Sequence, residues 1–237
     1  MADTAAEVST EPTPGLLTRV IGVLLSPRET YAAVAARPKA LGVLLLTIAI
    51  FAIGQGWFVS TEVGKDIVMD QQVRAMESFG VTISDEMYAQ MESRMSYAPY
   101  TTAGSMLVFL PLSNALVAGL LLLVFSMMMG GTGTFKQLFA IVSHSNVIVA
   151  LQQLIVIPLS LAAGRMASAN LAIFVPMLEE DAFLTVFLGT IDLFLVWWVI
   201  SLAIGTGVLY KRKTGPIATV FLSLYVVIAL ILAFVRS

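Results

Sequence analysis

The chain has 237 residues, of which 58% are hydrophobic and 12% are charged, and its mean hydropathy is +0.92. Because a soluble domain carries about 25% charged residues, this composition excludes an ordinary soluble globular protein and indicates an integral membrane protein. The absence of cysteine excludes disulfides and thiolate sites, and a single histidine excludes a multi-histidine metal centre. The net charge of −2 argues against nucleic-acid binding.

Five apolar stretches are long enough to cross the hydrocarbon layer as helices, which takes about 20 residues. Their residues are apolar all round rather than along one stripe, and they lack the period-two alternation of barrel strands. The sequence therefore predicts an all-α membrane protein with five transmembrane helices, over residues 40–59, 103–129, 135–163, 184–210 and 216–235.

The distribution of lysine and arginine predicts how these helices are oriented. If the N-terminus lies inside, the inner flanks hold more Lys and Arg than the outer flanks, as the positive-inside rule requires. The acidic residues favour the outer flanks. We therefore expect the N-terminus inside and the C-terminus outside, with these cations inside: Arg19, Arg28, Arg37, Lys39, Lys136, Lys211, Arg212 and Lys213.

Two segments precede the first span. Residues 1–15 contain little that could be buried and are expected to form a disordered tail. Residues 16–38 are expected to form two amphipathic interfacial helices, the second opened by Ser26 and Pro27 with Glu29 completing a capping box. They would either anchor the chain at the membrane surface or provide a docking surface for a cytoplasmic partner. The rest of the chain, 39–237, is expected to form one membrane domain.

The outer loop of residues 60–102 is too long for a simple connection. Ser84 is expected to open a helix with Met87, Met91 and Met95 on one face. A helical hairpin over the outer end of the bundle is one interpretation. The other is a flexible methionine face that binds a partner.

Polar side chains inside the predicted spans are the main candidates for a functional site. Asp192, Asn114, Gln152 and Gln153 lie at similar depths and could form one hydrogen-bonded cluster between three helices. Such a cluster would either hold the helices together or bind a proton or cation. His144 is flanked by two serines, but neighbouring helical positions point about 100° apart, so a Ser–His catalytic pair is disfavoured and a neutral histidine bonded to another helix is expected.

Three segments at the predicted inner side resemble the bacterial members of the Yip family. They are residues 24–34 (LLSPRETYAAV) with Arg37 and Pro38, residues 130–137 (GGTGTFKQ) and residues 209–216 (LYKRKTGP). The resemblance covers residues 16–237 and implies a five-span, non-enzymatic membrane protein. Eukaryotic members bind Rab-type GTPases in vesicle trafficking, a role that bacteria, which lack a Rab system, would not share. The chain departs from the family at 144–147 (HSNV), where a tyrosine–serine pair followed by proline is common.

The sequence thus predicts a non-enzymatic scaffold that binds a protein partner or lipid in membrane organisation, in a bacterial inner membrane. Its contacts with the partner or with anionic lipid would come from Arg28, Lys136, Lys211, Arg212 and Lys213. A homo-oligomer is compatible with this function, and no cofactor or metal is expected. The alternative is a small proton, cation or solute transporter or channel centred on Asp192, and a hydrolase using His144 is a third, weaker hypothesis.

Overall fold

The computed structural model describes residues 14–179 and 182–236, and within these ranges it is helical, with one isolated antiparallel bridge between Asn170 and Asp192 and no strand. The prediction of an all-α protein is confirmed. Residues 1–13 of the predicted tail lie outside the described ranges. The elements are α1 (Leu16–Leu25), α2 (Pro27–Ala36), α3 (Leu41–Phe58), α4 (Glu62–Ser78), α5 (Asp85–Met95), α6 (Ala98–Leu122), the π-helical η1 (Leu123–Met128), α7 (Phe135–Ala163), the 3-10 helix η2 (Leu171–Phe174), α8 (Phe183–Thr190), α9 (Leu193–Leu209) and α10 (Thr214–Arg236).

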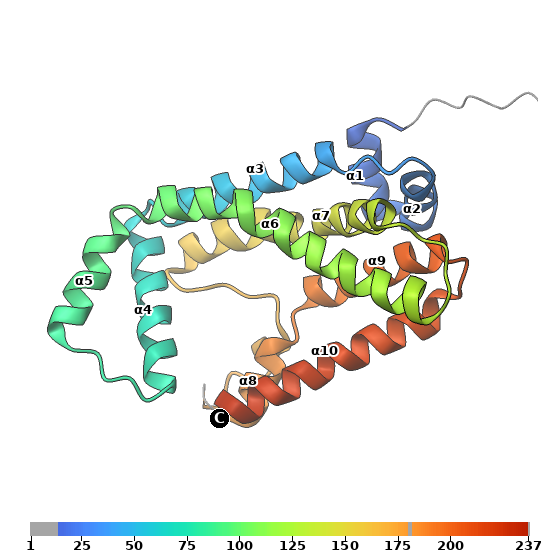
Figure 1. Ribbon diagram of the computed structural model, residues 1–237. Coiled ribbons are helices and arrows are strands. Elements are labelled where there is room, and N and C mark those ends of the chain that lie inside the picture. Colours follow the sequence, from blue (N-terminus) through green and yellow to red (C-terminus); the bar gives the residue numbers. More distant parts are fainter. Residues whose placement is uncertain (1–13, 180–181, 237) are drawn as a thin grey trace, which may run out of the picture.

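Four helices of the described part of the chain are long and apolar enough to cross a membrane: α3, α6 with η1, α7 and α10. They lie side by side as an elongated bundle (Figure 1). α7 runs through its centre and packs against α1, α2, α3, α6 and α9. The second span begins earlier than predicted, at Ala98, because Pro99 suits the first turn of a helix, where its missing N–H is not needed.

The predicted fourth span, residues 184–210, is wrong as one continuous helix. The chain is helical in α8, extended at Ile191 and Asp192, and helical again in α9, which has only 17 residues. Asp192 causes the restart: its carboxylate accepts hydrogen bonds from the backbone N–H groups of Phe194 at 2.8 Å and Leu195 at 3.1 Å. A carboxylate bound in this way is an N-cap, so Asp192 begins a helix and is not in the middle of one.

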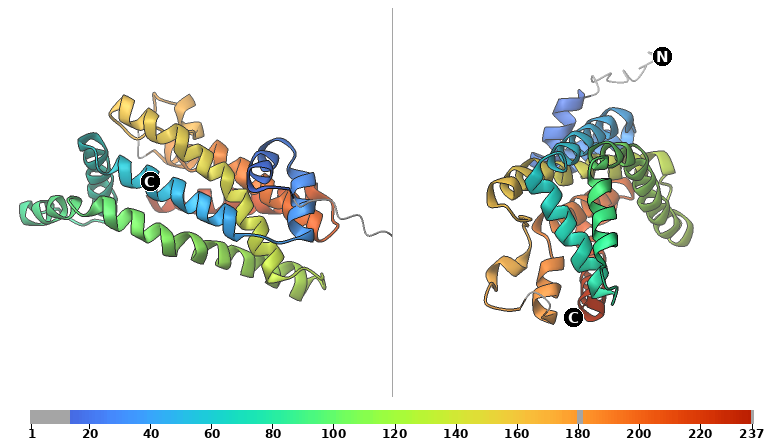
Figure 2. Two further views of the ribbon diagram at one scale, coloured as in Figure 1. Left: turned by 90° about the horizontal axis from the view of Figure 1, so that it is seen from above. Right: turned by 90° about the vertical axis from the view of Figure 1, so that its left-hand side faces the viewer.

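Helices α1 and α2 lie at one end of the bundle, together with the α6–α7 and α9–α10 connections (Figures 1 and 2). Val23, Tyr31 and Val34 are fully buried in the main core with residues of α7 and α9. The two predicted helices are therefore present, but they pack into the bundle instead of only lying along a membrane surface. The predicted capping box at Ser26 is wrong, since its side chain makes no cap hydrogen bond.

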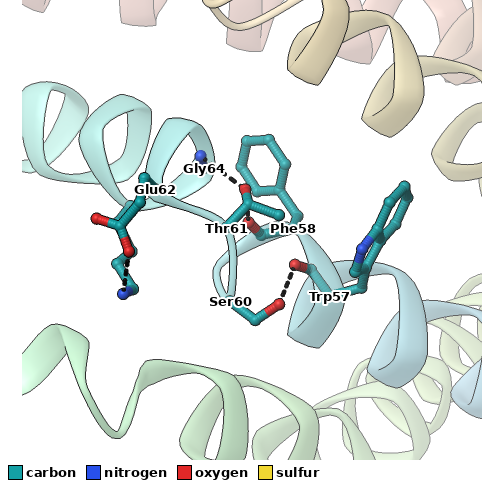
Figure 3. Close-up of polar contacts among 7 residues, drawn as sticks. Trp57, Phe58, Ser60, Thr61, Glu62 and Gly64 are labelled. Carbon is teal, nitrogen blue, oxygen red and sulfur yellow. Dashed lines mark hydrogen bonds and ion pairs between the residues drawn. The ribbon is translucent and has the colours of Figure 1, made fainter.

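Helices α4 and α5 lie at the opposite end (Figure 2). Ser84 caps α5 as predicted, and Met95 of the methionine face is buried. Figure 3 shows the corner between α3 and α4, where Thr61 donates a 2.8 Å hydrogen bond to the Phe58 carbonyl and accepts one of 3.0 Å from the Gly64 N–H. One threonine thus pairs a carbonyl at the end of α3 and an N–H at the start of α4, and this fixes the exit of the chain from α3.

Candidate functional site

The end of the bundle that carries α1 and α2 holds the predicted partner-contacting cations, and a buried tyrosine fixes its shape. The hydroxyl groups of Tyr31 on α2 and Ser201 on α9 are 2.6 Å apart, and burial raises the pKa of Tyr31 well above its usual value. The ring packs against Gly205, where an added Cβ would come within 3.2 Å of Tyr31 and 2.4 Å of Ile141. α2 can approach α9 this closely because position 205 has no side chain.

The glycine-rich turn between α6 and α7 holds a second tyrosine. A Cβ at Gly131 would lie 2.5 Å from the Tyr210 ring, and one at Gly133 would lie 2.6 Å from it. The same ring stacks on Phe125, and its hydroxyl is 2.7 Å from the Ser126 hydroxyl, which donates to the Gly133 carbonyl. The glycines of this turn thus allow the Tyr210 ring to pack closely against it.

The three successive cations after Tyr210 lie in a tight helix-ending turn. Lys211 has φ of 52°, the left-handed conformation that favours glycine, and its N–H donates to the Val208 carbonyl. The Arg212 N–H donates to the Gly207 carbonyl at 2.8 Å. This is the Schellman pattern of a helix C-terminus, formed here with lysine in the position that glycine usually takes. The turn leaves Lys211, Arg212 and Lys213 exposed.

The structure brings four of the five predicted contact residues together. Arg28 on α2 and Lys211, Arg212 and Lys213 line one cavity of about 410 Å³. Lys136 is exposed at the start of α7, at the same end of the bundle, but does not line this cavity. Within the described ranges, none of these cations is ion-paired with a carboxylate. We call these five residues the basic surface.

His144 lies below this surface, fully buried, and its partners show which nitrogen carries the proton. Arg19 of α1 is 3.2 Å from Nε2, and because arginine only donates, Nε2 must accept. Nδ1 then donates to the Ala140 carbonyl at 2.7 Å. The flanking Ser143 and Ser145 donate to the carbonyls of Phe139 and Val142. The histidine therefore links α1 to α7, and its contacts do not provide a serine nucleophile.

The predicted intramembrane cluster is divided into separate hydrogen-bonded groups. Asn114 on α6 donates to Ser143 at 3.2 Å and accepts from Asn146 at 2.7 Å. Asn146 also accepts from the indole N–H of Trp198 on α9 at 2.9 Å. This group joins α6, α7 and α9, and three of its residues, Ser143, Asn146 and Trp198, were not part of the predicted cluster.

The second group surrounds Asp192. Gln152 of α7 donates to its carboxylate at 2.8 Å. Tyr225 of α10 accepts a 3.0 Å hydrogen bond from the Asp192 N–H and donates to the Thr190 carbonyl at 2.6 Å, so it satisfies the backbone at the break. The Asn170–Asp192 bridge holds the preceding loop to the same point. Gln153 takes no part, because its carbonyl oxygen accepts from Gln55 on α3.

The side chains of these groups take part in hydrogen bonds within the bundle. No set of three or more His, Cys, Asp or Glu side chains in the described ranges is placed to hold a metal ion. Each polar side chain of the Asn114 and Asp192 groups has a partner of its own. Both groups stabilise contacts between helices, while the exposed cations of the basic surface remain available to a ligand.

Comparison with known families identifies the chain. The family model described as the Yip1 domain matches residues 21–236, which includes α2 to α10 and the three inner segments of the sequence. Searches among curated proteins and among solved structures gave no match. The match covers nearly all the chain, and the helical membrane architecture agrees with it. The chain is an integral membrane protein that belongs to the Yip1 family.

Proposed function

We propose that this protein acts without catalysis, as a membrane scaffold whose basic surface binds a partner at the membrane face. The observation that carries the proposal is that Arg28 of α2 and the cations that follow α9 line one cavity and have no carboxylate partner in the described ranges. Because Tyr31 fixes α2 against α9, this surface is assembled before any partner arrives. A preorganised surface binds more tightly, since fewer groups must be ordered on binding.

We also propose that the chain crosses the membrane five times, with α9 and the segment before it as the fourth crossing. α7 ends at the α4–α5 end of the bundle and α10 begins at the α1–α2 end, so the chain must return between them (Figure 1). α9 alone is about 25 Å long, a few Å short of the hydrocarbon layer of about 30 Å, and the extended residues before it add length. We propose the remaining domain assignments as well: residues 16–38 as interfacial helices that form the docking part of the basic end, 39–237 as the membrane domain and 60–102 as its outer loop.

We propose that the basic surface and the N-terminus lie inside and the C-terminus outside, and the bias of lysine and arginine supports this orientation. This orientation and the resemblance to bacterial Yip proteins support a location in a bacterial inner membrane. The cytoplasmic side would then offer the basic surface to a soluble or membrane protein. A homo-oligomer, with the basic surface of each copy facing the same side, is compatible with this arrangement.

Affinity purification from native membranes, followed by mass spectrometry of bound proteins, tests the scaffold. Deleting α1 and α2 would open the core, so point variants are better: Arg28→Gln, Lys136→Gln and Lys211→Gln combined. Arg94→Gln with Arg165→Gln is the control, because both cations are exposed. Arg94 belongs to α5 and Arg165 follows the end of α7, and both of these elements reach the end of the bundle opposite α1 and α2 (Figure 1). We expect a stoichiometric partner that is lost only with the first set. A partner retained by that set, or turnover of a substrate by the pure protein, would contradict the proposal.

A second candidate function is transport of a proton or cation at Asp192. The break between α8 and α9 favours it, because interrupted helices form ion sites in many transporters. Flux into liposomes separates the two functions. Asp192→Asn keeps a side chain that can cap α9 but removes the charge, so lost flux in a folded variant would support transport. Unchanged or absent flux in both proteins would exclude this role.

A further inference from the structure

An apolar groove starts beside the basic surface and extends into the membrane part of the bundle. It has a volume of about 710 Å³ and lies between α6 with η1, α9 and α10. Such a volume is in the range of about 300–1,000 Å³ that small-molecule sites occupy. Leu121, Phe125 and Leu202 are buried in it, whereas Val220 and Leu224 on its α10 side are largely exposed. The groove is therefore accessible from the hydrocarbon layer.

The length of the groove matches one leaflet of a bilayer. Its α10 side includes Pro216 and Ile228, which are about 18 Å apart along a helix. One leaflet contributes about half of a hydrocarbon layer of about 30 Å. A single acyl chain lying along α10 would thus stay within the leaflet in which it begins.

Two cations connect this groove to the basic surface. Arg212 and Lys213 line both the groove and the 410 Å³ cavity that Arg28 and Lys211 complete. The apolar part therefore ends in a concentration of positive charge, and the first turn of α10 adds the positive end of its helix dipole. An apolar helix from a second copy of the chain would fill the groove but leave these cations without an anion.

We propose that the groove and the adjoining cavity bind one anionic phospholipid, with an acyl chain along α10 and the phosphate headgroup at Arg212, Lys213 and Arg28. The inference rests on the proposed function, because it names a ligand for part of the basic surface. The cations select the headgroup charge, and the groove selects a molecule with a hydrocarbon tail. A soluble phosphate compound would meet only the first requirement.

Fluorescence of Trp198, which lines the groove, provides the test. The full chain with Trp57→Phe and Trp197→Phe keeps this tryptophan as its only one. It is reconstituted in phosphatidylcholine vesicles with a minor fraction of either brominated phosphatidylglycerol or brominated phosphatidylcholine. Bromine on the acyl chain quenches tryptophan on contact, so the ratio of the two quenching curves measures the preference for the anionic lipid.

We expect brominated phosphatidylglycerol to quench Trp198 at a lower mole fraction than brominated phosphatidylcholine. Arg212→Gln with Lys213→Gln should reduce this preference about thirtyfold, since each of the two basic residues near an anionic headgroup contributes about 1 kcal/mol. Lys39→Gln with Arg94→Gln, which removes two exposed charges that line neither the groove nor the adjoining cavity, should leave it unchanged. The exchange Arg212→Lys with Lys213→Arg should also preserve it, and this guards against loss of folding.

Equal quenching by the two lipids in the reference protein would overturn the proposal, because ordinary boundary lipid behaves in that way. A preference that survives Arg212→Gln with Lys213→Gln would overturn it too. Quenching by neither lipid would overturn it as well, because the groove would then be filled by protein, such as a second copy of the chain. None of these results affects the scaffold proposal, which depends on a protein partner that co-purifies through the basic surface.

Discussion

Tyr31 on α2 and Ser201 on α9 share a 2.6 Å hydrogen bond although they are 170 positions apart in the chain, and both side chains are buried. A hydroxyl pair in an apolar interior is costly to separate, because each group would be left without a partner. The bond therefore makes α2 part of the folded core. It also determines where Arg28, three positions before Tyr31, lies relative to the cations that follow α9.

Tyr31→Phe should lower the free energy of unfolding by about 1–3 kcal/mol, because it leaves the buried Ser201 hydroxyl unpaired. Adding Ser201→Ala should restore part of this loss, since both polar groups are then absent. Thermal unfolding in detergent measures both effects. Tyr88→Phe on the exposed side of α5 is the control and should have no effect. A Tyr31→Phe protein as stable as the control would contradict the role given to this bond.

Gly205→Ala should destabilise the protein by about 1–3 kcal/mol, because the new Cβ would meet Ile141 at 2.4 Å and force α2, α7 and α9 apart. Gly119→Ala on α6 is the matched control, because it also adds a Cβ to a helical glycine but no neighbouring atom lies within 4 Å of that Cβ. It should stabilise the helix by up to about 1 kcal/mol. Equal melting temperatures of the two variants would show that the close packing of α2 against α9 does not contribute to the stability of the protein.

Lys211→Gly should stabilise the fold by about 1 kcal/mol, because lysine is held at a φ of 52° that glycine adopts without strain. Lys211→Ala keeps the strain and should melt near the unmodified protein. The same Lys211→Gly variant should bind the protein partner more weakly, since one charge of the basic surface is lost. If Lys211→Gly increased both the stability and the affinity for the partner, lysine at this position would have no functional reason.

Asp192→Ala should lower the free energy of unfolding by about 1–2 kcal/mol, because α9 loses its N-cap and Gln152 loses its acceptor. Asp192→Asn should cost much less, since asparagine caps helices as well as aspartate does. Chemical unfolding of the two variants in the same detergent compares them. A large loss with Asp192→Asn would indicate that the charge of Asp192, and not its hydrogen bonds, stabilises the break.

The long apolar runs made most of the fold predictable, because a membrane-spanning helix needs little more than length and hydropathy. The interruption at Asp192 was missed since one aspartate hardly alters the hydropathy of residues 184–210. A signal was present: Asp is a preferred N-cap, and an apolar run follows it directly. An N-cap at residue 192 would have divided the predicted span as the structure does.

The polar contacts were harder to predict, because residue counting gives the depth of a side chain but not its direction around the helix. Gln152 and Gln153 lie at the same depth but point about 100° apart, so one reaches Asp192 on the α9 side and the other Gln55 on α3. Tyr225 was missed because its position in α10 gives no indication of a distant backbone break. The sequence could predict that Arg28 and Lys211 to Lys213 lie on one side of the membrane, because the charge bias assigns them to the same flank. It could not predict the cavity that they line, because that cavity depends on how α2 packs against α9.

The basic surface is accessible to a cytoplasmic partner only if it faces the inside, and single-cysteine labelling tests this most directly. The natural chain has no cysteine, so Thr132→Cys at the basic end and Ser93→Cys at the opposite end can be made without further changes. Both positions are exposed. We predict that a membrane-impermeant maleimide labels position 93 in intact spheroplasts and position 132 only after permeabilisation. Labelling of position 132 in intact spheroplasts would contradict it.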